Sequence, residues 1–114
     1  MTVIRQDELI QSVAGALQYI SYYHPVDFIR AVKEAYEREE SKAAKDAMAQ
    51  ILVNSRMSAM GHRPICQDTG IVTVFCKVGM NVTFESEMSL DDMINEGVRR
   101  AYNYPDNVLR ASVL

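Results

Sequence analysis

Cysteine is scarce in this sequence: the 114 residues include only two, Cys66 and Cys76. They stand ten positions apart, so they do not form a CxxC redox pair, and two thiols cannot supply a disulfide framework. The N-terminal residues also lack the basic segment and apolar core of a secretory signal. These absences favour a reducing, cytoplasmic compartment.

Long apolar runs and excess positive charge are missing as well. No run approaches the roughly 18 apolar residues that a membrane-spanning helix needs. The formal net charge is −3, whereas a general nucleic-acid-binding domain carries a basic face. We therefore expect neither a membrane nor a nucleic acid as a partner, although a local group of arginines could still hold a small anion.

The composition is that of a globular protein. Apolar residues make up 48% and charged residues 24%, and these proportions argue against a disordered chain. The length suits one small domain, residues 1–114, and no linker, repeat or low-complexity segment divides it. The last residues, 108–114, are apolar and contain no stop signal, so we expect the chain to break off within the domain.

The first half of the sequence predicts three helices. Apolar residues in 9–20 recur at three- and four-residue steps, as the buried face of a helix requires. Pro25 fits the first turn of a second helix. Ser41 is a candidate N-cap for a third helix that ends at Gly61. The side chains expected to face inward are Leu9, Ile10, Val13, Leu17 and Ile20, then Phe28, Ile29, Val32, Ala35 and Tyr36, then Ala44, Met48, Ile51, Leu52 and Ser55.

The second half predicts a short sheet and a fourth helix. Residues 71–78 are largely β-branched or aromatic and almost continuously apolar, which indicates a strand covered on both faces. A turn at 79–81 leads into a second strand at 82–84, and Ser89 with Asp92 resembles the capping box of a following helix. That helix would turn Met93, Ile94, Val98 and Ala101 inward. The fold class is therefore helix-rich α+β: three helices, a β-hairpin or sheet segment and a further helix, in an incomplete domain.

A loop at 61–70, between the third helix and the strand, gathers the chemistry of the chain. It holds a guanidinium, a thiol, an amide, a carboxylate and a hydroxyl within a few residues. Cys66 could ligate a metal, because thiolates favour soft metals and iron–sulfur clusters. Gln67 and Asp68 could orient a hydroxyl or carboxyl group, and Gly70 permits a positive φ. The same residues also fit a buried thiol and a capped turn. One cysteine cannot hold a cluster, so the residues alone leave both interpretations open.

Other polar residues near this loop have plain explanations. Cys76 lies within the predicted strand, where packing in the core is favoured over metal ligation. His62 could contact an anion, but the polarity of the turn explains it equally well. Arg99 and Arg100 could form a small basic patch, although a solvated helix face is the favoured interpretation.

The string Arg63-Pro-Ile-Cys-Gln-Asp-Thr-Gly70 resembles the signature of the class I (iron–sulfur) fumarate hydratase and L-tartrate dehydratase alpha family. The predicted helices before the string, the apolar strand after it and the helix that leads to a Leu-Arg step are also similar to the N-terminal region of that family. The resemblance extends over nearly the whole chain and implies an N-terminal fragment of such an enzyme.

The resemblance also implies a cofactor and a set of site residues. In that family three cysteines bind a [4Fe–4S] cluster that keeps one iron open to substrate. Cys66 corresponds to the first of these cysteines, and the other two would lie downstream. Gln67 and Asp68 correspond to residues that contact the substrate, and Arg110 corresponds to an arginine that binds a substrate carboxylate. The catalytic base would lie in the absent C-terminal part, so the resemblance assigns no catalytic residue to this chain.

The function implied by the resemblance is that of the N-terminal portion of a hydro-lyase that interconverts fumarate and (S)-malate in the tricarboxylic acid cycle. The complete enzyme would be a cytoplasmic homodimer, and residues 1–114 alone would bind no intact cluster and be inactive. An L-tartrate dehydratase alpha-type subunit is a close alternative. A non-catalytic helical assembly module with an inert Cys66 is an alternative of another class. The iron content and activity of the complete protein distinguish these hypotheses.

Overall fold

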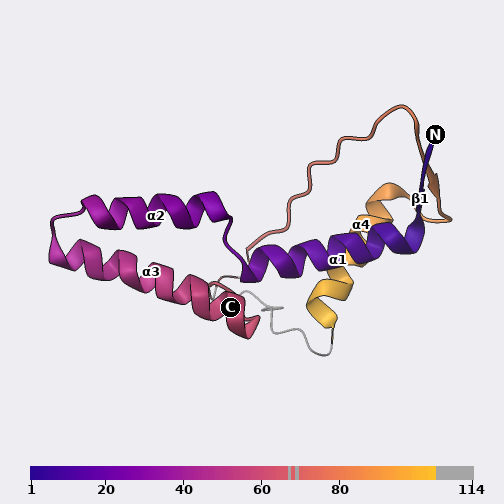
Figure 1. Cartoon of the computed structure of the whole chain (residues 1–114). Helices are drawn as coiled ribbons and strands as arrows, with labels where there is room; N and C mark the ends of the chain where they lie inside the picture. The colour runs from indigo at the N-terminus through magenta and orange to yellow at the C-terminus, as the bar shows by residue number, and fades with distance from the viewer. Residues whose placement is uncertain (67, 69, 105–114) are drawn as a thin grey trace. The chain divides into compact units, whose positions relative to one another are not determined.

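A computed structural model describes residues 1–66, 68 and 70–104. The chain divides into two compact units, one of residues 1–18 with 68–114 and one of residues 19–67. Helix α1, Gln6–Tyr22 (Figure 1), contributes residues to both units. None of the helices in the described residues combines the length and the apolarity that crossing a membrane requires.

The unit of residues 19–67 is built on a helical hairpin. Helices α2, Val26–Arg38, and α3, Lys42–Gly61, follow each other after a short connection and pack together (Figure 1). Pro25 occupies the N-cap of α2, directly before its first turn. Ser41 caps α3 as predicted, because its Oγ accepts a hydrogen bond from the backbone N–H of Ala44 at 3.4 Å.

The interior of this hairpin is partly polar. Ser55 on α3 is buried, as predicted, and its Oγ lies 3.0 Å from Nδ1 of His24. All of α2 is described, and none of its residues is buried. The expected burial of Phe28, Ile29 and Ile51 is wrong, since they are 40%, 37% and 44% exposed. Two packed helices cover only one stripe of each other, so an apolar face wider than that stripe remains exposed.

The sheet belongs to the other unit. Strand β1, Thr2–Arg5, pairs in parallel with β2, Val82–Glu85, and Arg5 stands opposite Glu85 in the register. Their side chains form an exposed ion pair at 3.5 Å. The helix-rich α+β fold class, with a sheet segment after three helices, is confirmed. Strand β1 was not predicted, because it is very short and its partner is remote in the sequence.

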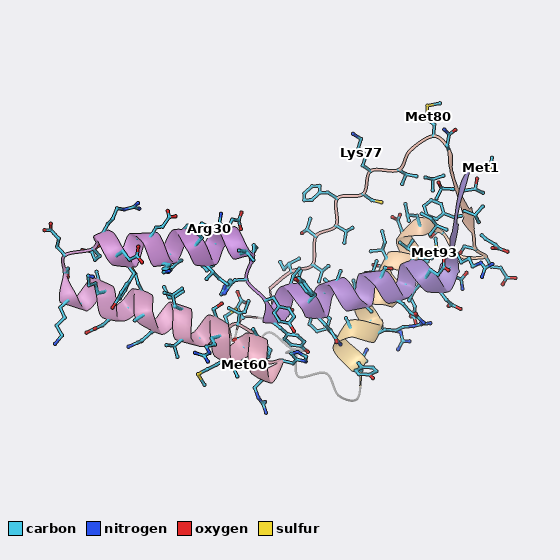
Figure 2. All side chains as sticks on the ribbon, in the orientation of Figure 1. Met1, Arg30, Met60, Lys77, Met80 and Met93 are labelled. Carbon is cyan, nitrogen blue, oxygen red and sulfur yellow. The ribbon has the colours of Figure 1, made fainter. Side chains whose placement is uncertain are left out.

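Residues 71–78 are not a strand, which corrects the sequence-based prediction. The segment runs as an extended trace in Figure 1, and Figure 2 labels Lys77 within it and Met80 in the turn that follows. Ile71 and Phe75 are each 94% exposed, so the expected cover on both faces is also wrong. Within the described residues, no backbone hydrogen bond pairs this segment with another, since β2 pairs with β1 and no hairpin forms. High β-propensity does not make a strand without a partner to complete the ladder.

The start of the last helix is held by polar contacts. Helix α4, Leu90–Asn103, begins after Ser89, whose Oγ accepts from the backbone N–H of Asp92 at 3.1 Å, so the predicted cap is confirmed. Just before it, the Ser86 hydroxyl donates to Oε1 of Gln6 at 2.8 Å. This bond ties the segment between β2 and α4 to the first turn of α1.

The core of this unit lies between α1 and α4. Ile10 on α1 and Met93 and Ala101 on α4 are each 1% exposed, which confirms the predicted inward position of all three. Gly97 is buried between them. A Cβ at Gly97 would lie 2.7 Å from Cβ of Val13 and 2.9 Å from the carbonyl oxygen of Ile10. The close approach of the two helices therefore depends on the missing side chain of this glycine.

Candidate functional site

The candidate site is the loop that follows α3, and the structure describes it in two parts. Cys66 and Asp68 lie within the described residues, whereas Gln67 and Arg110 lie outside them. Cys66 belongs to the unit of residues 19–67, and Asp68 belongs to the other unit. The predicted roles of Gln67 and Arg110 therefore stay predictions.

The part that carries Cys66 begins where α3 ends. The helix ends at Gly61 as predicted, but the left-handed residue is His62, with φ 48° and ψ 53°. Non-glycine residues adopt this conformation infrequently. The backbone N–H groups of His62 and Arg63 both donate to the carbonyl oxygen of Ser58, the latter at 3.2 Å. These bonds close the helix and fix the direction in which the chain leaves it toward Cys66.

Two tyrosines at the end of α1 hold the His62 ring. The imidazole stacks on Tyr22, with ring centroids 5.5 Å apart and planes at 6°. Its Nε2 lies 2.8 Å from Oη of Tyr23. Tyr22 is 8% exposed, and burial, with a smaller contribution from Tyr23, raises the pKa of its phenol. Tyr22 is therefore un-ionised at neutral pH and serves as a packing surface for the histidine.

Both backbone polar groups of Ile65, the residue before Cys66, are paired. The Ile65 N–H donates to the carbonyl oxygen of Ser21 on α1 at 2.9 Å. The Ile65 carbonyl oxygen accepts from Nδ2 of Asn54 on α3 at 2.8 Å. Cys66, the next residue, is exposed. An exposed thiol thus follows directly on a turn that is anchored to two helices.

The part that carries Asp68 is a small turn. Oδ1 of Asp68 accepts from the backbone N–H of Gly70 at 3.0 Å, the pattern by which Asp side chains stabilise turns. Gly70 has a φ of 68°, which confirms the expected use of a positive φ and favours glycine. Asp68 is exposed. The turn-capping interpretation of Asp68 is confirmed, and its contact with a substrate remains a prediction.

The thiols show how far the chain fits an iron–sulfur cluster. Cys76 is exposed like Cys66, so its expected burial in a strand core is wrong. Among the residues that the structure describes, no group of three or more His, Cys, Asp or Glu side chains could hold a metal ion. A [4Fe–4S] cluster is held by several cysteine thiolates. The described residues therefore do not supply a complete set of cluster ligands.

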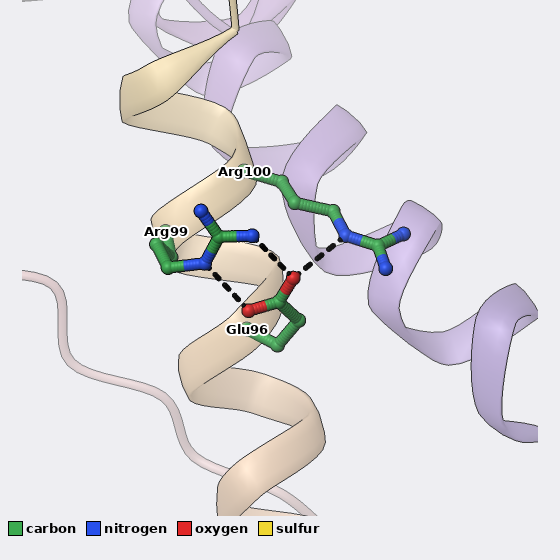
Figure 3. Close-up of polar contacts among 3 residues, drawn as sticks. All are labelled: Glu96, Arg99 and Arg100. Atoms are coloured by element: carbon green, nitrogen blue, oxygen red, sulfur yellow. Dashed lines mark hydrogen bonds and ion pairs between the residues drawn. The ribbon is translucent and has the colours of Figure 1, made fainter.

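Arg99 and Arg100 do not form an unpaired basic patch. Both guanidinium groups bind Glu96: Arg99 donates through Nε and Nη2 at 2.7 Å each, and Arg100 through Nε at 3.0 Å (Figure 3). These hydrogen bonds hold the pKa of Glu96 down to about 2. The carboxylate is ionised at neutral pH and offsets part of the positive charge, so the solvated helix face is the better interpretation.

The sequence-based reasoning missed two residues beside the site, Asn54 and Tyr23. Their contacts join residues 11 and 39 positions apart, which no local pattern reveals. One signal was available for Asn54. Asparagine is a poor residue for a helix interior because its side chain competes for backbone hydrogen bonds, and Asn54 lies well inside α3.

Comparison with known proteins covers most of the chain. The sequence profile of the family described as fumarate hydratase (Fumerase) matches residues 10–114. Over 79 residues, the chain is 37% identical to a Methanocaldococcus jannaschii protein named "Putative L(+)-tartrate dehydratase subunit alpha". That match covers 69% of this chain and 28% of the M. jannaschii protein. The chain therefore spans less than a third of the length of this curated relative.

Proposed function

Because this chain belongs to the fumarate hydratase family, we propose that it supplies the N-terminal part of an iron–sulfur hydro-lyase that interconverts fumarate and (S)-malate. The observation that carries the proposal is the exposed Cys66 at the end of an anchored turn. It lies in the Arg63–Gly70 string, within the region that the family profile matches.

Cys66 is the proposed cluster ligand of this chain. Its thiol is exposed, and the preceding residue is held from both sides, at 2.9 Å by Ser21 and at 2.8 Å by Asn54. Because the residue before the thiol is already held, less of the chain has to be ordered when a cluster binds, which favours binding. When bound, a [4Fe–4S] cluster would supply a Lewis-acidic iron at the substrate hydroxyl. The other thiolate ligands would come from parts of the complete protein outside residues 1–114.

The residues after Cys66 are proposed to orient the substrate. The Asp68 carboxylate accepts from Gly70 N–H at 3.0 Å, which restricts its rotation. An ionised carboxylate accepts several hydrogen bonds, so Asp68 can also accept one from a substrate hydroxyl. The Gln67 amide would donate a hydrogen bond to the substrate, or accept one from it, beside Asp68. Arg110 would bind a substrate carboxylate through paired N–H donors. The base that removes the substrate C3 proton is assigned outside residues 1–114.

Dehydration of L-tartrate is the second candidate function. The 37% identity to the M. jannaschii protein named for that activity favours it. Tartrate carries a hydroxyl group at the carbon where malate carries only hydrogens. A site built to pair that additional hydroxyl would discriminate strongly between the two acids. Assays with malate and with L-tartrate as substrates therefore distinguish the two candidate functions.

The test is anaerobic reconstitution with iron and sulfide, followed by assays with fumarate, malate and L-tartrate. It is carried out on the 114-residue chain and on a polypeptide of full family length that contains it. We expect cluster absorbance and fumarate hydration only in the longer polypeptide, since one cysteine of this chain corresponds to a ligand. Turnover of tartrate alone would favour the second candidate. Absence of cluster and activity in both proteins would favour the non-catalytic assembly module with an inert Cys66.

A further inference from the structure

We infer that Asn54 is a positioning residue for Cys66. Its Nδ2 donates at 2.8 Å to the carbonyl oxygen of Ile65, the residue directly before the cysteine. This contact fixes the peptide that joins Ile65 to Cys66 and thereby the place from which the thiol is presented. The contact stands on the structure alone. Its consequence, the alignment of a cluster ligand, rests on the proposed function.

The planarity of the peptide bond carries the effect from Asn54 to Cys66. The carbonyl group of Ile65 lies in one plane with the N and Cα atoms of Cys66. A hydrogen bond to that carbonyl oxygen therefore restrains the Cα atom of the cysteine. The second anchor, from Ile65 N–H to the Ser21 carbonyl at 2.9 Å, restrains the other side of Ile65. Together the two anchors restrain the backbone of Ile65 on both sides of its Cα atom.

The other contacts of this loop act further from the thiol. His62 binds Tyr23 and stacks on Tyr22, and Arg63 N–H reaches the end of α3, so these contacts fix the chain two or more residues before Ile65. The Asn54 side chain, in contrast, contacts the peptide next to Cys66.

The chemistry of the contact requires a donor at position 54. A carbonyl oxygen only accepts hydrogen bonds, and the amide of asparagine offers N–H groups that a leucine of similar size lacks. Gln50 provides the matched comparison. It carries the same amide group on α3, one turn earlier, and is exposed.

The test compares Asn54→Leu with Gln50→Leu in the 114-residue chain, without iron. Leucine is a good helix former, so α3 is preserved in both variants. We expect the carbonyl ¹³C resonance of Ile65 to move upfield in Asn54→Leu only. Exchange of the Ile65 amide hydrogen should accelerate roughly fivefold in that variant, the factor that one ordinary hydrogen bond contributes. Gln50→Leu should change the exchange by less than about twofold, and Asn54→Gln, which keeps the donor, should restore it in part.

Alkylation of the two thiols measures how the loss of the Asn54 contact changes the accessibility of Cys66. Cys76 is exposed and belongs to the other unit, so it is an internal reference in the same molecule. We expect Asn54→Leu to raise the ratio of Cys66 to Cys76 alkylation by iodoacetamide about twofold, because a loosened turn presents its thiol more freely. An unchanged ratio, or an equal rise at both thiols, would overturn the inference even if Ile65 responds. Neither readout needs a cluster, so a failed lyase assay would leave this test intact.

Discussion

The start of the Arg63–Gly70 string and the stretch that follows it differ in the contacts that hold them. Residues 62–65 bond to helices α1 and α3, through Ile65 at 2.9 Å and 2.8 Å and through Arg63 at 3.2 Å. Residues 71–78 form no backbone pair with any described residue, and Ile71 is 94% exposed. Neither stretch is helix or strand, but the one with the strong β-forming composition is the one without such backbone hydrogen bonds. Local preference is thus less decisive here than the presence of a partner.

The difference shows what each part of the chain encodes by itself. Ser21 and Asn54, which anchor Ile65 before Cys66, both belong to the unit of residues 19–67. The core of the other unit lies where α1 packs against α4, and Ile71 and Phe75 of its extended segment are exposed. Changes to the core should therefore be costly, and changes to the extended segment should be nearly neutral.

Gly97→Ala is expected to have the largest effect on stability. The new Cβ would meet Val13 at 2.7 Å and the Ile10 carbonyl oxygen at 2.9 Å, and overpacking of this kind costs about 1–3 kcal/mol. Gly15→Ala on α1 is the control, because its Cβ would meet nothing within 4 Å. It should stabilise the helix by up to about 1 kcal/mol. Urea unfolding measures both, and an equal loss in the two variants would contradict the role of the α1–α4 contact.

Hydrogen exchange compares residues 62–65 with residues 71–78 directly. We expect the amides of residues 71–78 to exchange near the rate of an unstructured peptide. The Ile65 amide, bonded to Ser21 at 2.9 Å, should exchange at least about tenfold more slowly relative to its intrinsic rate. Slow exchange throughout 71–78 would show that this segment has found a partner, and the comparison would fail.

The Glu96 cluster on α4 predicts a pH effect. The pKa of Glu96 falls from the ordinary 4.5 to about 2 in the folded chain. A lowered carboxyl pKa stabilises the fold above the ordinary value, and this contribution is lost as the pH falls from 4.5 toward 2. Glu96→Gln should flatten that part of the stability profile, and salt should weaken the effect because the arginines are exposed. Unfolding midpoints between pH 2 and 6 test this, and an unchanged slope in the variant would exclude Glu96 as its source.

Phe75→Ser should have the smallest effect. The Phe75 side chain is 94% exposed, and exposed substitutions away from special contacts change the free energy of unfolding by less than about 0.5 kcal/mol. Urea unfolding of the 114-residue chain measures this. A loss above about 1 kcal/mol would mean that Phe75 is buried in solution and would remove the contrast with the α1–α4 core.

The elements that could be predicted are those with local signals. The caps at Ser41 and Ser89 are correct because a cap involves only the next helical turn. Strand β1 escaped prediction because its pairing with Val82–Glu85 is a long-range event. The motif made Cys66 and Asp68 candidate site residues from their identity and order, and these roles stay predictions. Asn54 could not be found in the same way, because its role depends on the return of the chain past α3.

The central claim, that Cys66 is the cluster ligand of this chain, is tested most directly by comparing Cys66→Ser with Cys76→Ser. Both are made in a polypeptide of full family length that contains this chain and are reconstituted anaerobically with iron and sulfide. Both cysteines are exposed here, so the two substitutions are matched. We predict that Cys66→Ser loses the cluster absorbance and fumarate hydration while keeping its circular dichroism, and that Cys76→Ser keeps all three. Wild-type cluster content and turnover in Cys66→Ser would contradict the claim.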